Sequence, residues 1–348
     1  MKCSRLWFVC SMGAIVLAAG FGAALGQEES EQQQRRRRSR SEENRPIRVH
    51  DPSTIVKHNG VYWTFTTGRG VSSLKSTDLV HWERGPSALP DPPDWITDVV
   101  PDQRGFFWAP DVIELDGRFL LYYSVSAFGK RTSAIGLAIS PSLDPDDPDY
   151  GWEDHGIIVE TSEESDHNAI DPGVLLDEDG RLWMTYGSFW SGIKLVELDP
   201  ATGKRIAPDS PLYSLAHKEQ IEAANIVHHD GYYYLLLNWG WCCRGVRSTY
   251  NIRVGRSREI TGPYVDQEGA DMLEGGGTLV LDTEGRFIGP GHPGILRDGD
   301  QLLMSYHFYD REQNGRSALA IRPIEWTEDG WPQVAGPPIT PPQSSATE

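Results

Sequence analysis

The most constraining feature of this sequence is an internal repeat that covers most of the chain. Five segments share one pattern: a short polar start, an apolar run, a tight turn and a second run rich in aromatic residues. The segments are DPSTIVKHNGVYWTFTT from Asp51, APDVIELDGRFLLYYSV from Ala109, DPGVLLDEDGRLWMTYGS from Asp171, EAANIVHHDGYYYLLLN from Glu222 and GHPGILRDGDQLLMSYHF from Gly291. Such self-similarity predicts units that cannot bury their own faces and therefore stack on one another.

Each repeat has the composition of a β-hairpin. Asn-Gly or Asp-Gly in the turn is the strongest short-range hairpin signal, and the flanking runs alternate and are rich in β-branched and aromatic residues. Further strand-like runs follow, for example after Ala134 and from Tyr250. Four short strands per unit, repeated five times, predict an all-β fold, a five-bladed β-propeller.

The repeat also predicts which side chains meet. When the segments are aligned, one position holds four acids and one histidine at spacings of 60, 60, 51 and 70 residues: Asp51, Asp111, Asp171, Glu222 and His292. The first strand of a propeller blade lines the central axis, so these side chains are expected to converge at one end of the channel. Converged carboxylates repel one another, and this repulsion indicates a chemical task.

Glycoside hydrolysis suits converged carboxylates. It needs a protonated acid for the leaving oxygen and an ionised carboxylate that activates water or attacks the sugar. A third carboxylate can raise the pKa of the acid by like-charge repulsion. Two other interpretations stay open from the residues alone: acids that cap turns on a solvated rim, and a hard cation such as calcium held by oxygen ligands with His292 nearby.

The two ends of the chain are expected to lie outside the repeats. Residues 1–26 combine a basic start, an apolar run and small residues before Gln27, which predicts a secretory signal peptide, with a membrane anchor as the alternative. Residues 27–46 are polar and charged and predict a disordered linker. The catalytic propeller is expected over 47–333, followed by a C-terminal tail over 334–348. We expect the mature protein to be secreted (extracellular or periplasmic), monomeric and not bound to a membrane.

Charge and cysteine content exclude several classes of function. The 348 residues carry a formal net charge of −18, which argues against nucleic acid as a partner because phosphate backbones are bound by clustered basic side chains. Four cysteines are too few for a disulfide scaffold, and loss of the signal would leave Cys242 and Cys243. This adjacent pair either closes a strained vicinal disulfide or remains as two free thiols.

Several motifs, in this order along the chain, resemble glycoside hydrolase family 43 and, within it, the endo-1,5-α-L-arabinanases. The resemblance extends from about residue 47 to residue 333. The motifs are His50-Asp51-Pro52-Ser53-Thr54, Phe107-Trp108-Ala109-Pro110-Asp111-Val112, Asn168-Ala169-Ile170-Asp171-Pro172, Gly187-Ser188-Phe189-Trp190-Ser191-Gly192-Ile193, Ile221-Glu222-Ala223, Ser248-Thr249-Tyr250-Asn251-Ile252-Arg253-Val254-Gly255-Arg256-Ser257 and Gly289-Pro290-Gly291-His292.

This resemblance implies a five-bladed propeller that cleaves internal α-1,5 links of plant cell-wall arabinan or arabino-oligosaccharides with inversion of configuration. It implies Asp51 as the general base, Glu222 as the general acid and Asp171 as the carboxylate that raises the pKa of the acid and orients it. It also implies that His292 is the channel histidine associated with a central calcium ion through the water shell of the ion. The expected sugar contacts are Trp108, Asp111, Phe128, Asn168, Ser188 and Trp190.

Three other functions stay open at this point. An exo-acting α-L-arabinofuranosidase or β-xylosidase of the same family differs in the loops that close one end of the cleft, which sequence reads poorly. A non-catalytic carbohydrate-binding propeller is disfavoured by the presence of all three carboxylates. A retaining propeller hydrolase acting on fructosides would use its aspartate as a nucleophile.

Overall fold

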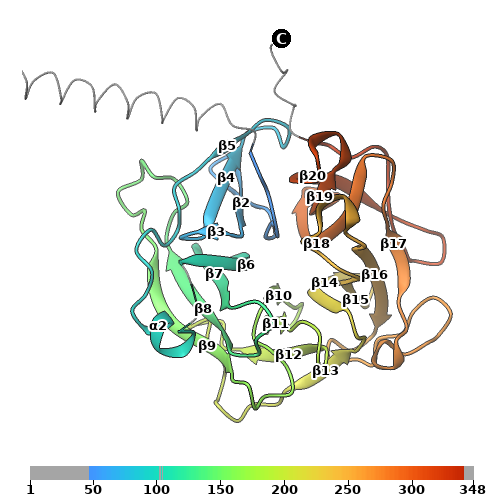
Figure 1. The fold of residues 1–348 in the computed structure, drawn as a ribbon, viewed down its shortest axis with the longest axis horizontal. Coiled ribbons are helices and arrows are strands. Elements are labelled where there is room, and N and C mark those ends of the chain that lie inside the picture. Colours follow the sequence, from blue (N-terminus) through green and yellow to red (C-terminus); the bar gives the residue numbers. More distant parts are fainter. Residues whose placement is uncertain (1–46, 102, 104, 341–348) are drawn as a thin grey trace, which may run out of the picture. The chain divides into compact units, whose positions relative to one another are not determined.

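The computed structural model describes residues 47–101, 103 and 105–340. The expected signal peptide, the expected linker and the last eight residues of the expected tail lie outside these ranges. The described chain forms five antiparallel sheets arranged around a central axis (Figure 1). The five-bladed β-propeller expected from the repeats is therefore confirmed. No helix in the described ranges is long and apolar enough to cross a membrane.

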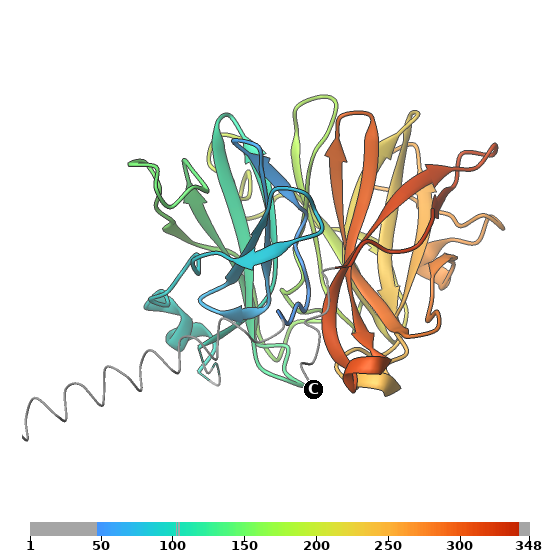
Figure 2. The same cartoon turned by 90° about the horizontal axis from the view of Figure 1, so that it is seen from above.

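The blades follow one another along the chain, and Figure 2 shows them from the side. Blade 1 contains β1 (Val56–His58), β2 (Val61–Thr66), β4 (Ser72–Ser76) and β5 (Trp82–Arg84). Blade 2 contains β6 (Phe106–Leu115), β7 (Arg118–Ser126), β8 (Ser133–Ser140) and β9 (Glu153–Thr161). Blade 3 contains β10 (Gly173–Leu176), β11 (Leu182–Tyr186), β12 (Ile193–Leu198) and β13 (Tyr213–Ala216).

The last two blades follow the same plan. Blade 4 contains β14 (Ile221–His229), β15 (Tyr232–Trp239), β16 (Asn251–Ser257) and β17 (Thr278–Leu281). Blade 5 contains β18 (Phe287–Asp298), β19 (Gln301–Asp310), β20 (Arg316–Trp326) and β21 (Pro332–Val334). The short elements between strands are β3 (Gly68–Arg69), which pairs with β6, the helix α2 (Trp95–Val99), and the 3-10 turns η1 (Gly245–Arg247), η2 (Met272–Glu274) and η3 (Arg311–Gln313).

Hairpins form where the sequence has Asn-Gly or Asp-Gly. Asn59 and Gly60, between β1 and β2, have φ angles of 51° and 82°. Asp116 and Gly117, between β6 and β7, have φ angles of 52° and 72°. A two-residue turn with both central residues in the left-handed region matches the twist of the flanking strands, so these turns fix the pairing of the strands on either side.

Buried apolar side chains fill the space between each pair of neighbouring blades. Successive clusters join blades 1 and 2, 2 and 3, 3 and 4, and 4 and 5. A further cluster joins blade 5 to blade 1 and includes Ile55, Tyr62, Leu303 and Ile321. No strand is shared between blades 5 and 1 in the described ranges. This apolar cluster therefore closes the ring, together with hydrogen bonds such as those from the backbone N–H of Val49 to Ser317 and from the Tyr62 hydroxyl to Asp298.

The described chain continues to bond with blade 5 beyond residue 333. Strand β21 ends at Val334, and Ile339 exchanges two backbone hydrogen bonds with Ile321 of β20. Part of the segment expected as a tail therefore adds to the fifth blade.

Asp111 joins three blades below the surface of the ring. Its Oδ1 accepts a hydrogen bond from the backbone N–H of Thr54 at 2.8 Å, and its Oδ2 accepts one from Val174 at 2.8 Å. The residue is 2% exposed, and burial raises the pKa of its carboxyl to about 6. One buried carboxylate on β6 therefore connects the segment that leads into β1 with β10 of blade 3.

The alignment of Asp111 with the other acids is two residues out of register. In blades 1 and 3 the aligned aspartate precedes a proline, as in Asp51-Pro52, and the matching pair in blade 2 is Ala109-Pro110. A shift of two residues keeps a side chain on the same face of a strand but moves it about 7 Å along the strand. Asp111 does not line the cleft that holds Asp51, Asp171 and Glu222, and the expectation of five converging side chains is corrected for this residue.

Replacing Asp111 by alanine leaves two buried N–H groups without an acceptor. Because each unsatisfied buried donor costs roughly 1–3 kcal/mol, we expect Asp111→Ala to lower the free energy of unfolding by about 3 kcal/mol in urea titrations at pH 7.5. The exposed Glu325 in β20 provides a control, and Glu325→Ala should change stability by less than about 0.5 kcal/mol. Equal stability of the two variants would contradict the bridging role.

Candidate active site

A cleft of about 1080 Å³ is lined by residues from all five blades. Three carboxylates line it: Asp51 before β1, Asp171 before β10 and Glu222 within β14. The backbone is left-handed at Asp51 (φ 50°), at Asp171 (φ 59°) and at Ala223 (φ 56°). This conformation is unfavourable for residues other than glycine and is concentrated at functional sites. The same backbone feature thus recurs in three blades where a carboxylate faces the cleft.

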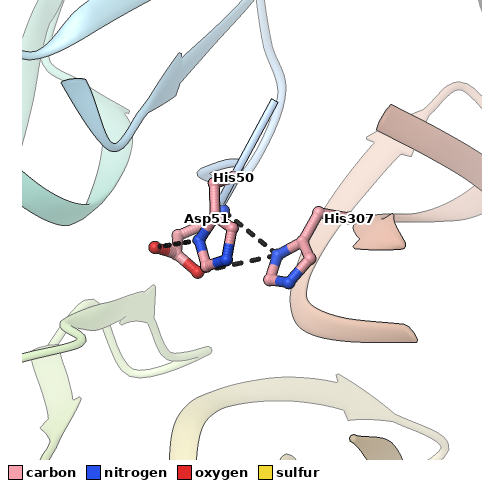
Figure 3. A group of neighbouring side chains, drawn as sticks. All are labelled: His50, Asp51 and His307. Carbon is pink, nitrogen blue, oxygen red and sulfur yellow. Dashed lines mark hydrogen bonds and ion pairs between the residues drawn. The ribbon is translucent and has the colours of Figure 1, made fainter. Parts of the chain in front are cut away.

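Two histidines and a threonine hold Asp51, as Figure 3 shows in part. Its Oδ2 lies 2.7 Å from Nδ1 of His50 and accepts a hydrogen bond from the hydroxyl of Thr67 at 2.6 Å. Its backbone N–H donates to Nδ1 of His307 at 3.1 Å. Because this ring nitrogen accepts, His307 is neutral, and burial lowers its pKa well below the ordinary value.

The ion pair between His50 and Asp51 fixes the charge of both groups. Burial disfavours the charged form of each, but their mutual attraction raises the pKa of His50 to about 10 and lowers the pKa of Asp51 far below its ordinary value. On the other side of the ring, the Tyr309 hydroxyl lies 2.8 Å from Nε2 of His50. Asp51 is therefore ionised, and no described side chain hydrogen-bonds its Oδ1, which faces His307 at 3.6 Å and His292 at 3.7 Å.

Glu222 is held by two hydroxyl groups. Ser188 donates to its Oε2 at 2.7 Å, and Tyr250 donates to its Oε1. Burial raises the pKa of Glu222 to about 7, and the charge of Asp51 adds to the effect, although the two hydrogen bonds oppose it. Near neutral pH a large share of Glu222 therefore keeps its proton, whereas Asp51 does not.

Asp171 is electrostatically coupled to Glu222. Burial, then repulsion from Glu222 and from Asp51, raises the pKa of Asp171 well above its ordinary value. The backbone N–H of Ala223 donates to its carboxylate, and its own N–H donates to Ser124 at 3.0 Å. Ionisation of one carboxyl therefore makes ionisation of the other less favourable.

Aromatic rings cover part of the cleft. Trp108 contacts Phe128 with ring centroids 4.9 Å apart, and Phe128 is 82% exposed. In a second group, Phe189 contacts Trp241 at 5.4 Å and Trp190 at 6.4 Å. Exposed rings beside polar groups mark a binding surface more often than a packed core, and their flat apolar faces suit the faces of sugar rings.

The structure brings most of the expected site residues together. The residues that line the cleft are Asp51, Asp171, Glu222, Trp108, Phe128, Asn168, Ser188 and Trp190. Asp111 and His292 do not line it. Asn168 has a second effect, because its Oδ1 accepts the backbone N–H of Ser188 at 3.0 Å and so positions the hydroxyl that binds Glu222.

Sequence reasoning missed the residues that hold the carboxylates. His50 and Tyr250 belong to motifs quoted above, and their position beside polar cleft residues was a usable signal. No local sequence pattern marks three further residues as part of the site: Thr67, His307 and Tyr309. They reach Asp51 or His50 only because the strands pair and the ring closes.

The surroundings of His292 test the expected calcium ion. Burial lowers the pKa of His292, so its imidazole is neutral, and its backbone N–H donates to Asn238 at 2.8 Å. His50, Asp51 and His307 offer potential ligand atoms within 4.8 Å of one another, but calcium takes six to eight oxygen ligands and two of these three groups are imidazoles. These side chains do not form a calcium cage, and the neutral imidazole of His292 fits an ion that keeps most of its water shell.

The five-bladed ring and a cleft with one ionised and one protonated carboxyl define a propeller of the kind that cleaves glycosidic bonds. The profile of Glycosyl hydrolases family 43 matches residues 44–332. The chain belongs to this family and is a glycosidase.

Relatives that are named for different activities resemble this chain to the same extent. The extracellular endo-α-(1→5)-L-arabinanase 1 of Bacillus subtilis is 41% identical, with 82% of this chain and 87% of the relative covered. The extracellular exo-α-(1→5)-L-arabinofuranosidase of Cellvibrio japonicus is 40% identical over 83% of this chain and 87% of the relative. The solved α-L-arabinanase of Cellvibrio cellulosa matches with a TM-score of 0.80 and 39% identity, covering 83% of this chain and 96% of that one.

The ion pair can be tested by titrating His50. Because Asp51 holds its pKa at about 10, we expect the His50 ring signals in NMR spectra to stay unchanged between pH 6 and pH 8. In Asp51→Asn the attraction is lost while burial remains, so the pKa should fall to its ordinary value of about 6.5 or below. Glu114→Gln, an acid on β6 outside the cleft, serves as the control and should leave the His50 signals unchanged. Titration of His50 near pH 6.5 in the parent protein would contradict the ion pair.

Proposed function

We propose that this protein hydrolyses the internal α-1,5 links of arabinan with inversion of configuration. The observation that carries the proposal is the opposite proton affinity of two buried carboxyls in one cleft, Asp51 and Glu222. Glycoside hydrolysis requires such a pair of an ionised base and a protonated acid. The names of the relatives support arabinan as the substrate, and a solved relative is described as complexed with arabinohexaose.

In this mechanism Asp51 acts as the general base and Glu222 as the general acid. Oδ1 of Asp51 takes a proton from a water molecule on the face of the sugar opposite the leaving group. The water oxygen bonds to the anomeric carbon while the glycosidic bond breaks, and Glu222 transfers its proton to the leaving oxygen. Asp171 accepts the backbone N–H of Ala223 and so orients Glu222, and whenever Asp171 is ionised its charge adds to the burial that raises the pKa of Glu222. Proton exchange with water then restores both carboxyls.

The substrate is held by stacking and by hydrogen bonds in this proposal. Trp108, Phe128 and Trp190 provide rings for the apolar faces of arabinofuranose units. Asn168 and Ser188 lie at the acid and position polar groups there. Removal of the Phe128 ring should therefore raise KM more than it lowers kcat.

Loss of either catalytic carboxyl group should remove most of the turnover. Because general acid–base groups contribute roughly 10²- to 10⁴-fold to the rate, we expect Asp51→Asn and Glu222→Gln to lower kcat on debranched arabinan by at least about a hundredfold. Unfolding temperatures, measured in parallel, should show that both variants still fold. Glu114→Gln, an acid on β6 outside this cleft, should keep parental activity. Near-parental activity of either cleft variant would refute the assignment.

An exo-acting arabinofuranosidase is the second candidate function, because a relative of that name is equally similar to this chain. The sizes of the products distinguish endo from exo action. We expect mixed oligosaccharides early in the digestion of debranched arabinan, whereas arabinose alone from the start would identify an exo enzyme. NMR of the first-formed anomer checks inversion. Binding to arabinan without turnover would point to a non-catalytic sugar-binding propeller.

We also propose that a hydrated calcium ion lies at the central channel beside His292. When bound, it would supply positive charge next to the carboxylates. Dialysis against EDTA should lower the unfolding temperature and the activity, and calcium should restore both more effectively than magnesium, which dehydrates reluctantly. His292→Ala should lose this response to calcium. An unchanged unfolding temperature after removal of metal would contradict a bound ion.

We also propose that the protein is exported from the cell and is a monomer. Two relatives are named as extracellular. Light scattering of the purified protein tests its monomeric state, and fractionation of the producing cells tests its export.

A further inference from the structure

Two adjacent cysteines lie in the wall of the cleft, and the mechanism above does not use them. Cys242 and Cys243 follow β15 and precede η1. Both thiols are free; Cys242 is half-buried and Cys243 is exposed. Both residues line the cleft. A small molecule that enters the cleft can therefore reach this pair.

Cys243 lies against the histidine that supports Asp51. Its Sγ is 3.7 Å from Nε2 of His50, while Nδ1 of the same ring is 2.7 Å from Asp51. Its backbone N–H donates to the Tyr309 hydroxyl at 2.7 Å, and that hydroxyl also bonds with His50. Sulfur, imidazole and carboxylate thus stand in the order found in activated thiol nucleophiles.

The two sulfur atoms differ in proton affinity. A hydrogen bond from Cys242 lowers the pKa of Cys243 to about 5, against partial desolvation by the wall of the cleft, and His50 lowers it further. The same contact and burial raise the pKa of Cys242. One sulfur is therefore a thiolate suited to attack, and its neighbour is a thiol that can respond in a second step.

A bond between these sulfurs would be easy to break. Consecutive Cα atoms are about 3.8 Å apart, whereas disulfides usually join Cα atoms roughly 4.4–6.8 Å apart. A vicinal disulfide is therefore strained, and strain makes a disulfide more readily reduced. Such a pair is suited to reversible oxidation rather than to structural cross-linking.

We propose that Cys242 and Cys243 form a thiol–disulfide exchange site that takes small disulfides from the cleft, with Cys243 as the attacking sulfur and Cys242 as the resolving one. We further propose that oxidation of the pair lowers hydrolysis; this second part rests on the proposed function.

The exchange takes place in two balanced steps. The Cys243 thiolate attacks one sulfur of the small disulfide, and the other sulfur leaves as a thiolate. Cys242 then loses its proton to solvent and attacks Sγ of Cys243, which releases the second small thiolate. Two protein thiols are oxidised to one disulfide, and one small disulfide is reduced to two thiols.

Oxidation changes the charges around Asp51. The Cys243 thiolate and the Asp51 carboxylate share the positive charge of His50 in the reduced protein. When the sulfur becomes part of a neutral disulfide, His50 keeps Asp51 as its anionic partner and loses the Cys243 thiolate. The pKa of Asp51 then falls further, and a weaker base activates water more slowly.

The exchange can be measured with 4,4′-dithiodipyridine, which releases coloured thiopyridone. The full chain is used with Cys3→Ser and Cys10→Ser in every sample, so that only this pair reacts. We expect two thiopyridones per reduced protein at pH 6 and no retained adduct by mass spectrometry. Cys242→Ala should release one and keep a mixed disulfide. Cys243→Ala should react about tenfold more slowly than Cys242→Ala. Cys243 is the faster sulfur because its larger thiolate fraction outweighs the lower nucleophilicity that accompanies its lower pKa.

Three results would overturn the exchange site. They are a single thiopyridone with a stable adduct on the intact pair, equal rates for the two alanine variants, and a faster reaction of Cys243→Ala. His50→Gln provides a further check, because it should slow the first release and leave the final count at two. A rate unaffected by His50→Gln would contradict the role of the imidazole.

The effect of oxidation on hydrolysis is measured in a separate experiment. The oxidised chain should cleave arabinan more slowly than the reduced chain, and dithiothreitol should restore the rate. Before any disulfide is added, Cys243→Ala should resemble the oxidised chain. Unchanged hydrolysis after complete oxidation would refute the coupling. If the reduced chain does not cleave arabinan at all, the proposed function fails, whereas the thiopyridone count still decides the exchange site.

Discussion

The closure of the ring between blades 5 and 1 is the constraint on which the cleft depends. No strand pairing crosses this boundary in the described part of the chain. The apolar cluster around Ile55 and Leu303 holds it together with hydrogen bonds such as the one from Tyr62 to Asp298. Asp51 comes from the first blade, while His307 and Tyr309, which bind its backbone and its histidine partner, come from the last. Loosening of this boundary would therefore disturb the proposed base before any other part of the site.

Burial acts on all three cleft carboxyls, but their partners decide the outcome. Asp51 has the cationic ring of His50 beside it and remains ionised. Glu222 has two neutral hydroxyls, which offset burial only in part, so its pKa rises to about 7. Asp171 has neighbouring carboxylates and a single backbone N–H, and its pKa rises well above the ordinary value. The proposed division of labour between base and acid follows from these differences.

The parts of this structure that follow from local signals could be predicted from the sequence. The turn at Asn59-Gly60 and its counterparts revealed the hairpins, and the repeated acids revealed the cleft. Asp111 was misplaced because two residues of register do not change the face of a strand, although Pro110 marks the correct alignment. The contacts of His307 and Tyr309 with residues 50 and 51 depend on closure of the whole ring, so no local pattern indicates them. Whether Cys242 and Cys243 are free or bonded depends on redox conditions, which the sequence does not specify.

The most direct test of the separated proton affinities is the pH dependence of kcat/KM for arabinohexaose in Tyr250→Phe. The Tyr250 hydroxyl stabilises the ionised form of Glu222, so its loss should raise the pKa of Glu222. We expect the alkaline limb of the profile, near pH 7 in the parent protein, to move to higher pH. Tyr232→Phe, a change of the same kind on β15 outside the cleft, should leave the limb in place. An alkaline limb that stays unchanged or moves to lower pH in Tyr250→Phe would contradict Glu222 as the proton donor.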